Sequence, residues 1–227
     1  MKLFGRIYDI KYTIGELASD CMINQDQRMY LRKNMDILII DDEELNVSQG
    51  LKDSNFSMYH KQDIDNIKDV EPYEIILCDI RGVGKRFSEA FEGAFIIKEI
   101  KKNYPNKHVI AYTASQYDAS YNTYLAEADN VIPKGTSLED WIAILDDEID
   151  KIVNPVHQWK LIREKLLKND VSTIETARLE SEYVRSFKEK DRKPLEKMAK
   201  QGADVVKSVM TQVLGSAAVK FFLGGAL

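Results

Sequence analysis

Four short apolar runs, each ended by a polar residue, constrain the fold of this chain most. They cover residues 37–40, 75–78, 109–112 and 131–133. Short apolar runs bounded by polar or turn residues are typical of strands that are buried on both faces of a parallel sheet. In an open α/β sheet the carboxyl ends of such strands meet at one edge, where ligands bind. The sequence therefore predicts an α/β domain with a polar site at that edge.

Polar side chains follow all of these runs. Asp41 and Asp42 come after the first run, Asp79 after the second, Thr113 after the third and Lys134 after the fourth. Crowded carboxylates repel one another unless a cation joins them, and hard oxygen ligands at this density suit a small divalent ion such as Mg²⁺. With that ion in place, the ammonium and the hydroxyl suit the other oxygens of a phosphoryl group on one carboxylate. We expect Asp79 to be the nucleophile.

Four stretches of the chain carry a family resemblance. They are MDILIIDDEEL (35–45), YEIILCDIRGVG (73–84), FIIKEIKKNYPNKHVIAYTAS (95–115) and LAEADNVIPKG (125–135). In this order and spacing they resemble a response-regulator receiver domain, over roughly half of the chain. The resemblance implies the receiver (flavodoxin-like) fold, which is α/β with a five-stranded parallel sheet in the order 2-1-3-4-5. All-α extensions would then lie on both sides of that domain.

The resemblance also implies a role for each site residue. Asp79 is similar to the phosphoacceptor, which takes its phosphoryl group from a histidine kinase or a phosphotransfer protein. The implied Mg²⁺ ligands are Asp79, Asp42, the backbone carbonyl of Arg81, and Asp41 acting through water or a hydrogen bond. Thr113 and Lys134 match the family's conserved hydroxyl and lysine. The chain would then be a phosphorylation-dependent switch that catalyses only its own Mg²⁺-dependent phosphotransfer, and not otherwise an enzyme.

Three positions depart from the family pattern. Gly135 follows the lysine where the family has proline, and Val131 stands where the family has an aromatic side chain that rotates inward on activation. Segment 80–92 is longer than the family's loop and carries Arg81, Lys85 and Arg86. These cations either attract a phosphoryl donor or belong to a solvated loop. Gly135 and Val131 favour an alternative function, a pseudo-receiver adaptor whose terminal helices drive oligomerisation or membrane association, whereas the retention of all five pocket residues argues against it.

Length and charge indicate a chain of several parts. We expect an N-terminal helix and linker at 1–34, the receiver domain at 35–153 and a helical region at 154–227. Residues 36–154 carry 24 acidic and 12 basic side chains, whereas residues 155–227 carry 9 acidic and 14 basic ones. The two parts would therefore attract each other, within one molecule or between two, or the basic part would face an anionic surface. Two cysteines and no apolar leader at the N-terminus predict a reducing, cytoplasmic location.

The N-terminal segment carries a short heptad pattern. Apolar side chains alternate in steps of four and three, at Leu3, Ile7, Ile10, Ile14, Leu17 and Cys21. This spacing puts them on one face of a helix. The helix would either form a coiled-coil dimer or lie against the chain's own C-terminal region, and we favour the second because the pattern is short and contains Gly5 and Gly15. Residues 24–34 would link it to the first strand.

The C-terminal region reads as helical. Asn154-Pro155 should end the receiver's last helix, and Pro194 should start another. In segment 202–227 a helical face is formed by Val206, Met210, Val213, Ala217 and Phe221. We expect that helix to be packed in a homodimer or higher oligomer or on the helical region, with a membrane-surface helix as the alternative. The basic stretch 185–200 has sparse aromatic residues, so nucleic acid is an unlikely partner.

Overall fold

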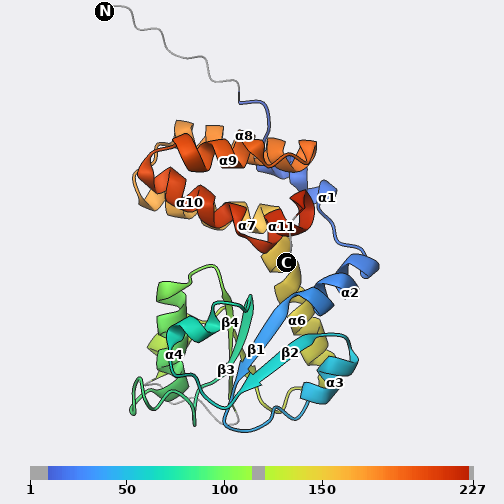
Figure 1. The fold of residues 1–227 in the computed structure, drawn as a ribbon, viewed down its shortest axis with the longest axis vertical. Helices are drawn as coiled ribbons and strands as arrows, with labels where there is room; N and C mark the ends of the chain where they lie inside the picture. The colour runs from blue at the N-terminus through green and yellow to red at the C-terminus, as the bar shows by residue number, and fades with distance from the viewer. Residues whose placement is uncertain (1–9, 114–120, 225–227) are drawn as a thin grey trace, which may run out of the picture. The chain divides into compact units, whose positions relative to one another are not determined.

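The computed structural model describes residues 10–113 and 121–224, which form two compact units (Figure 1). Gln25–Ile149 makes up one of them, here called the sheet unit. Met1–Asn24 and Asp150–Leu227 make up the other, here called the helical unit. The boundary between the two falls within helix α6, Leu138–Val153. Each unit is described by itself below.

The sheet unit is built on one parallel sheet. Its strands are β1 (Asp36–Ile40), β2 (Ser57–Lys61), β3 (Ile75–Asp79), β4 (His108–Thr113) and β5 (Asn130–Pro133). They lie in the order β2-β1-β3-β4-β5, and every pair is parallel. The predicted receiver fold, with its 2-1-3-4-5 order, is confirmed by this topology.

Alternation along the strands explains why both faces of the sheet are covered. Successive side chains of a strand point to opposite faces. Leu38 and Ile40 belong to a buried cluster with α4 (Glu92–Asn103) and α5 (Asn122–Leu125). On the other face, Tyr112 of β4 contacts Trp141 of α6. The remaining helices of this unit are α2 (Gln25–Asn34), α3 (Ser48–Asp53) and the short 3₁₀ helix η2 (Ile67–Val70).

The segment before β1 is a helix, so the prediction of a linker at 24–34 is wrong. Helix α2 has no glycine or proline, an acidic residue in its first turn and basic residues in its last, which suits the helix dipole. Leu31 is fully buried. The Arg32 guanidinium makes two bonds to the carboxylate of Asp146 on α6, at 2.8 and 2.5 Å, and a third to the carbonyl oxygen of Ser54 at 3.1 Å. The Cζ atom of Arg32 lies 4.7 Å from the ring centre of Phe56. These contacts attach α2 to the domain.

The helical unit contains five longer helices and two short N-terminal turns within its described part. The elements are η1 (Ile14–Glu16), α1 (Leu17–Asp20), α7 (Pro155–Lys168), α8 (Thr173–Glu189), α9 (Lys193–Gln201), α10 (Asp204–Leu214) and α11 (Ala217–Leu223). Asn154 caps α7 by accepting bonds from two backbone amides, and Pro155 occupies the first turn. Pro194 lies in the first turn of α9. The predicted helix end at Asn154-Pro155 and the predicted helix start at Pro194 are both confirmed.

The N-terminal segment is not one continuous helix in its described part, residues 10–21, while Leu3 and Ile7 lie outside the described residues. The chain is extended at Thr13, whose amide donates to the Glu16 carboxylate at 2.9 Å and so starts a new short helix. Leu17 is buried among side chains of α7 and α8. The expected packing against the C-terminal region is therefore confirmed, although the single helix is not.

The terminal segment also differs from the prediction of one helix. Helices α10 and α11 are bent by 60° at a break after Leu214. Ser216 is extended there, and its hydroxyl accepts the Val219 amide at 3.4 Å while donating to the Val213 carbonyl oxygen at 2.7 Å. No single described helix is long and apolar enough to cross a membrane; the bent pair meets that requirement by length and composition alone.

A substitution at Arg32 tests the attachment of α2. Arg32→Lys keeps the charge but loses the planar fork that bonds Asp146 in two places, so we expect the free energy of unfolding to fall by about 1–2 kcal/mol. Urea unfolding measures it. Lys33→Ala on the exposed side of α2 is the control and should change little. Equal effects of the two variants would contradict the structural role of Arg32.

Candidate functional site

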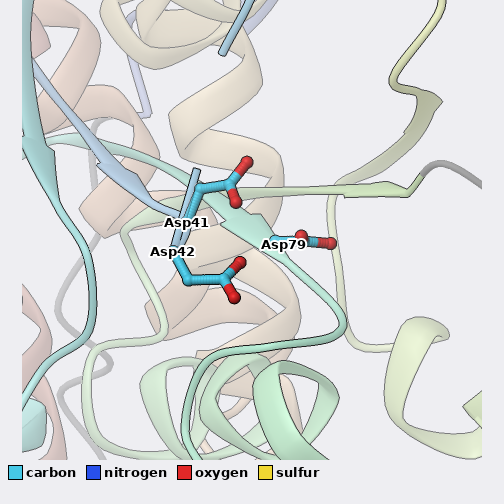
Figure 2. A group of neighbouring side chains, drawn as sticks. All are labelled: Asp41, Asp42 and Asp79. Carbon is cyan, nitrogen blue, oxygen red and sulfur yellow. The ribbon is translucent and has the colours of Figure 1, made fainter. Parts of the chain in front are cut away.

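Three carboxylates gather at the carboxyl edge of the sheet. One oxygen each from Asp41, Asp42 and Asp79 lies within 4.8 Å of the others (Figure 2). The strand register explains this, because Ile40 pairs with Cys78 and the next residues of β1 and β3 are the acidic ones. Asp41 and Asp79 are buried, whereas Asp42 is exposed. Their distances allow one metal ion to contact all three.

The backbone beside these carboxylates leaves no room for a side chain. Gly82 has a φ of +85°, and a Cβ atom there would lie 2.5 Å from Oδ1 of Asp42. The amide of Arg81 donates to Oδ1 of Asp79 at 3.3 Å, so its peptide group lies against the same carboxylate. Oxygen donors of this kind fit Mg²⁺. The residues present therefore suit the implied metal.

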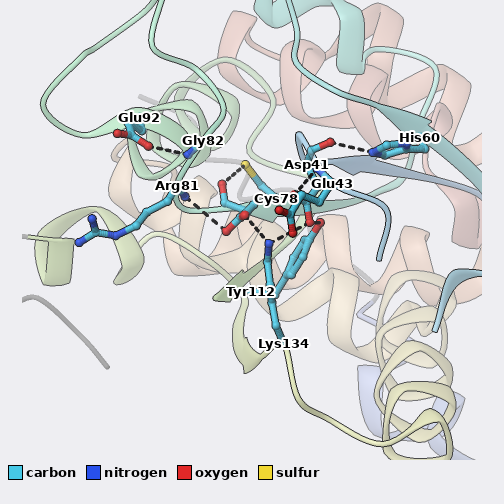
Figure 3. A network of polar contacts seen from close by, with 10 residues as sticks. Asp41, Glu43, His60, Cys78, Arg81, Gly82, Glu92, Tyr112 and Lys134 are labelled. Atoms are coloured by element: carbon cyan, nitrogen blue, oxygen red, sulfur yellow. Dashed lines mark hydrogen bonds and ion pairs between the residues drawn. The ribbon is translucent and has the colours of Figure 1, made fainter. Parts of the chain in front are cut away.

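Lys134 joins two of the carboxylates. Its ammonium lies 2.5 Å from Oδ2 of Asp79 and 3.1 Å from Oδ2 of Asp41 (Figure 3). The lysine follows β5, and its amide donates to the carbonyl oxygen of Thr113 at 2.8 Å, which ties the ends of β4 and β5 together. Burial lowers the pKa of the ammonium, but the bonds to Asp79 and Asp41 outweigh it, so the net pKa is raised. Lys134 is therefore a permanent cation at this edge.

Asp41 is held by several donors. Burial raises the pKa of this carboxyl, but hydrogen bonds from the Glu43 amide (3.0 Å), the Tyr112 hydroxyl (2.8 Å) and the Lys134 ammonium outweigh it and lower the pKa overall. A carboxylate that accepts this many bonds is ionised and fixed in orientation. The carbonyl oxygen of Asp41 is also hydrogen-bonded, to Nε2 of His60 at 2.7 Å.

Asp79 behaves in the opposite way. Burial raises its pKa, and the hydrogen bond and charge of Lys134 only partly oppose this, so the net pKa is raised. The fold therefore disfavours the ionised form of Asp79 and favours that of Asp41, although both share one lysine. Such a difference between neighbouring carboxyl groups is typical of functional sites.

The two remaining predicted residues lie near this group. Thr113 ends β4 and is buried. The Arg81 guanidinium points away from the carboxylates (Figure 3) and lies 5.3 Å from the ring centre of Tyr121. The structure thus brings the backbone of Arg81 to Asp79 and its cation to an aromatic ring. The positions of all these predicted residues relative to a bound ion or phosphoryl group stay a prediction.

Hydrogen bonds to two backbone amides fix the first part of the long loop after β3. The Glu92 carboxylate accepts the Gly82 amide at 2.6 Å, and the Asp63 carboxylate accepts the Gly84 amide at 2.9 Å. A Cβ atom on Gly93 would lie 1.8 Å from the carbonyl oxygen of Asp79, so only glycine fits where α4 passes β3. Later in the loop, Arg86 forms an ion pair with Asp65, and both side chains are exposed.

Sequence reasoning missed Tyr112, which donates to Asp41, and Glu92, which accepts the Gly82 amide beside Asp42. A tyrosine in an otherwise aliphatic strand is a usable signal, because a buried phenol needs a hydrogen-bond partner. Glu92 gave no signal, since its bond to the Gly82 amide joins residues across an irregular loop. Cys78 precedes Asp79, and burial raises the pKa of its thiol well above the usual range. It is a neutral core side chain, as expected.

Solved structures of other proteins are similar to this chain over about half of its length. No protein-family model and no curated protein matches the chain. It is similar to the receiver domain of NtrX from Brucella abortus, with 19% identity over 50% of this chain and 98% of that chain and a TM-score of 0.42. It is also similar to a response regulator from Thermotoga maritima, with 13% identity over 52% of this chain and 98% of that chain and a TM-score of 0.42. The sheet unit, by its own strand order, has the receiver fold.

Two substitutions test the opposed environments of the carboxylates. Because the fold penalises ionised Asp79, Asp79→Asn should raise the free energy of unfolding at pH 7 by about 1 kcal/mol without divalent cations. Because the pKa of Asp79 is raised in the folded state, the penalty is fully present at a pH above that folded-state pKa. It is lost as the pH falls through the folded-state pKa toward the lower pKa of the unfolded chain. The gain should therefore shrink between pH 7 and pH 4, as followed by thermal unfolding.

Asp41→Asn is the matched variant. The lowered pKa of Asp41 means that its ionised form stabilises the fold, so this variant should lose about 2 kcal/mol at pH 7. A loss of stability of similar size in both variants would contradict the assignment.

Proposed function

We propose that this protein is a phosphorylation-dependent signalling switch in which Asp79 accepts a phosphoryl group from a phosphohistidine. The donor would be a histidine kinase or a phosphotransfer protein. The observation that carries the proposal is the ammonium of Lys134 at 2.5 Å from Asp79, within a group that also holds Asp41 and Asp42. That combination gives the nucleophile a fixed cation and leaves Asp42, beside Asp79 itself, for a metal.

The chemistry needs few steps from the protein. An oxygen of ionised Asp79 attacks phosphorus, the new O–P bond forms, and the N–P bond of phosphohistidine breaks with its electron pair left on the imidazole nitrogen. Lys134 is placed to follow the transferred oxygens, because it already bonds the attacking carboxylate. Bound Mg²⁺, held by Asp42, Asp79 and the Arg81 backbone, would supply charge that neutralises the phosphoryl oxygens.

Asp41 and Asp79 divide the work under this proposal. Asp41 stays ionised and keeps Lys134 at the edge of the sheet, since its pKa is lowered. Asp79 has the raised pKa and the weaker hold on its charge. Of two carboxylates, the one with the higher pKa is the more basic, and its ionised oxygen is the stronger nucleophile. Asp79 is for that reason the better acceptor of the two.

The helical unit is the proposed output region. Helix α6 runs without interruption from residue 138 to 153 and links the sheet unit to it along the chain. Covalent addition at Asp79 changes the charge at the end of β3, and such a local change can bias a two-state element elsewhere. Val131 is partly buried against the sheet unit's core, so the family's aromatic switch is absent at this position or is rebuilt elsewhere.

Intact-mass measurement tests the acceptor. Wild-type protein incubated with acetyl phosphate and Mg²⁺ should gain one phosphoryl group, and Asp79→Asn should gain none. Lys134→Met should slow the reaction at least about tenfold, because it removes a charge that neutralises the transferred group. Asp53→Asn, an exposed carboxylate at the end of α3, is the control and should react as the wild type does. Equal labelling of wild type and Asp79→Asn would refute the proposal.

Hydrogen exchange separates a switch from a phosphorylation-independent adaptor. With beryllofluoride and Mg²⁺, amides of α6 and of the helical unit should change their exchange rates in the wild type and not in Asp79→Asn. An adaptor would show the same exchange in both proteins under both conditions.

A further inference from the structure

Tyr112 contacts more of the acidic group than any role inferred so far requires. Its side chain is fully buried at the end of β4, and its hydroxyl donates to Oδ2 of Asp41 at 2.8 Å. The register sets this position, because Tyr112 pairs with Asp79 on one side and with Ile132 on the other. It therefore lies in the same row of the sheet as the proposed phosphoacceptor.

The ring of Tyr112 is fixed by two further contacts. Its edge meets Trp141 of α6, with ring centres 6.1 Å apart at an angle of 83°. Its face lies 5.4 Å from the Lys134 ammonium, which is within the range of a cation–π contact. Tyr112 thus contacts both Asp41 and Lys134. It is itself held by α6, on the face of the sheet opposite to α4 and α5.

These contacts occupy the oxygens of Asp41. Oδ1 accepts the Glu43 amide at 3.0 Å, while Oδ2 accepts both the Tyr112 hydroxyl and the Lys134 ammonium. A carboxylate with this many donors has little capacity left for direct contact with a metal ion. Asp42 differs from it, because its side chain is exposed and lies against Gly82, where a Cβ atom would come within 2.5 Å of Oδ1.

We infer that Tyr112 is a positioning residue that keeps Asp41 from direct metal contact and holds Lys134 toward Asp79. Without the hydroxyl, Oδ2 of Asp41 has one donor fewer, so it attracts both the metal ion and the lysine more strongly. A metal ion would then bind more tightly, while Lys134 would be drawn from Asp79 toward Asp41. The inference concerns how the site is arranged and rests on the proposed function only for its effect on phosphoryl transfer.

Tyr112→Phe tests the inference, since it removes one oxygen atom and leaves the ring against Trp141. Calorimetric titration with MgCl₂ should show binding tightened by about tenfold, the order expected when one donor to a charged group is removed. At saturating Mg²⁺ the rate of labelling by acetyl phosphate should fall by about threefold or more, as Lys134 moves from the acceptor. A residue that served packing alone would weaken both properties or neither.

Tyr183→Phe is the matched control. Tyr183 is also buried, and its hydroxyl donates to the carbonyl oxygen of Pro155 at 3.0 Å in the helical unit. Tyr183→Phe should lower the free energy of unfolding about as much as Tyr112→Phe does, without changing the affinity for Mg²⁺.

The proposed function and the role of Tyr112 can be refuted independently of each other. Wild-type protein that binds Mg²⁺ but takes no phosphoryl group would refute the proposed function and leave the titration to decide the role of Tyr112. Mg²⁺ affinity that is unchanged or weakened in Tyr112→Phe would overturn that role, even if the wild type is phosphorylated. Absence of Mg²⁺ binding by the wild type would overturn it as well.

Discussion

The structure depends on one ammonium group that two strand ends share. Lys134 lies between Asp41 and Asp79, which follow or end neighbouring strands of the sheet. Three carboxylates at one edge would repel one another in its absence, and no other described cation bonds both of these oxygens. The same ion pair brings the end of β5 across β4 toward β3 and β1. Local sheet geometry and the chemistry of the site are therefore parts of one arrangement.

Parallel pairing makes this arrangement possible. The paired residues Ile40, Cys78 and Ala111 form one row, and the residues that follow them all emerge at the same edge. The apolar strands that produce this alignment are buried on both faces, so the charged atoms have only the edge available to them. Burial at this edge has a different net effect on the pKa of two chemically identical side chains, those of Asp41 and Asp79. Asp41 receives enough hydrogen bonds to offset it, whereas Asp79 does not.

The sequence predicted what depends on short-range pattern. Strand ends, the helix end at Asn154-Pro155 and the helix start at Pro194 rest on local chemistry that a sequence displays, whereas the strand order came from the family resemblance. The prediction from sequence failed where contacts that no local pattern displays decide the structure. Helix α2 is attached through Arg32 to Asp146, more than a hundred positions later. The break before α11 depends on a serine that caps a helix, and periodicity alone continues through it.

The glycines around the long loop divide it into parts that tolerate change differently. Gly82 and Gly84 have positive φ angles and adjoin Asp42 and Ile96, and Gly93 leaves no space beside the Asp79 carbonyl group. Between them, residues 85–90 are mostly exposed or half-buried. Changes in length and charge should therefore be tolerated in that inner stretch and not at the glycines on either side of it. A lineage of such chains can alter what approaches the acidic group without disturbing the group itself.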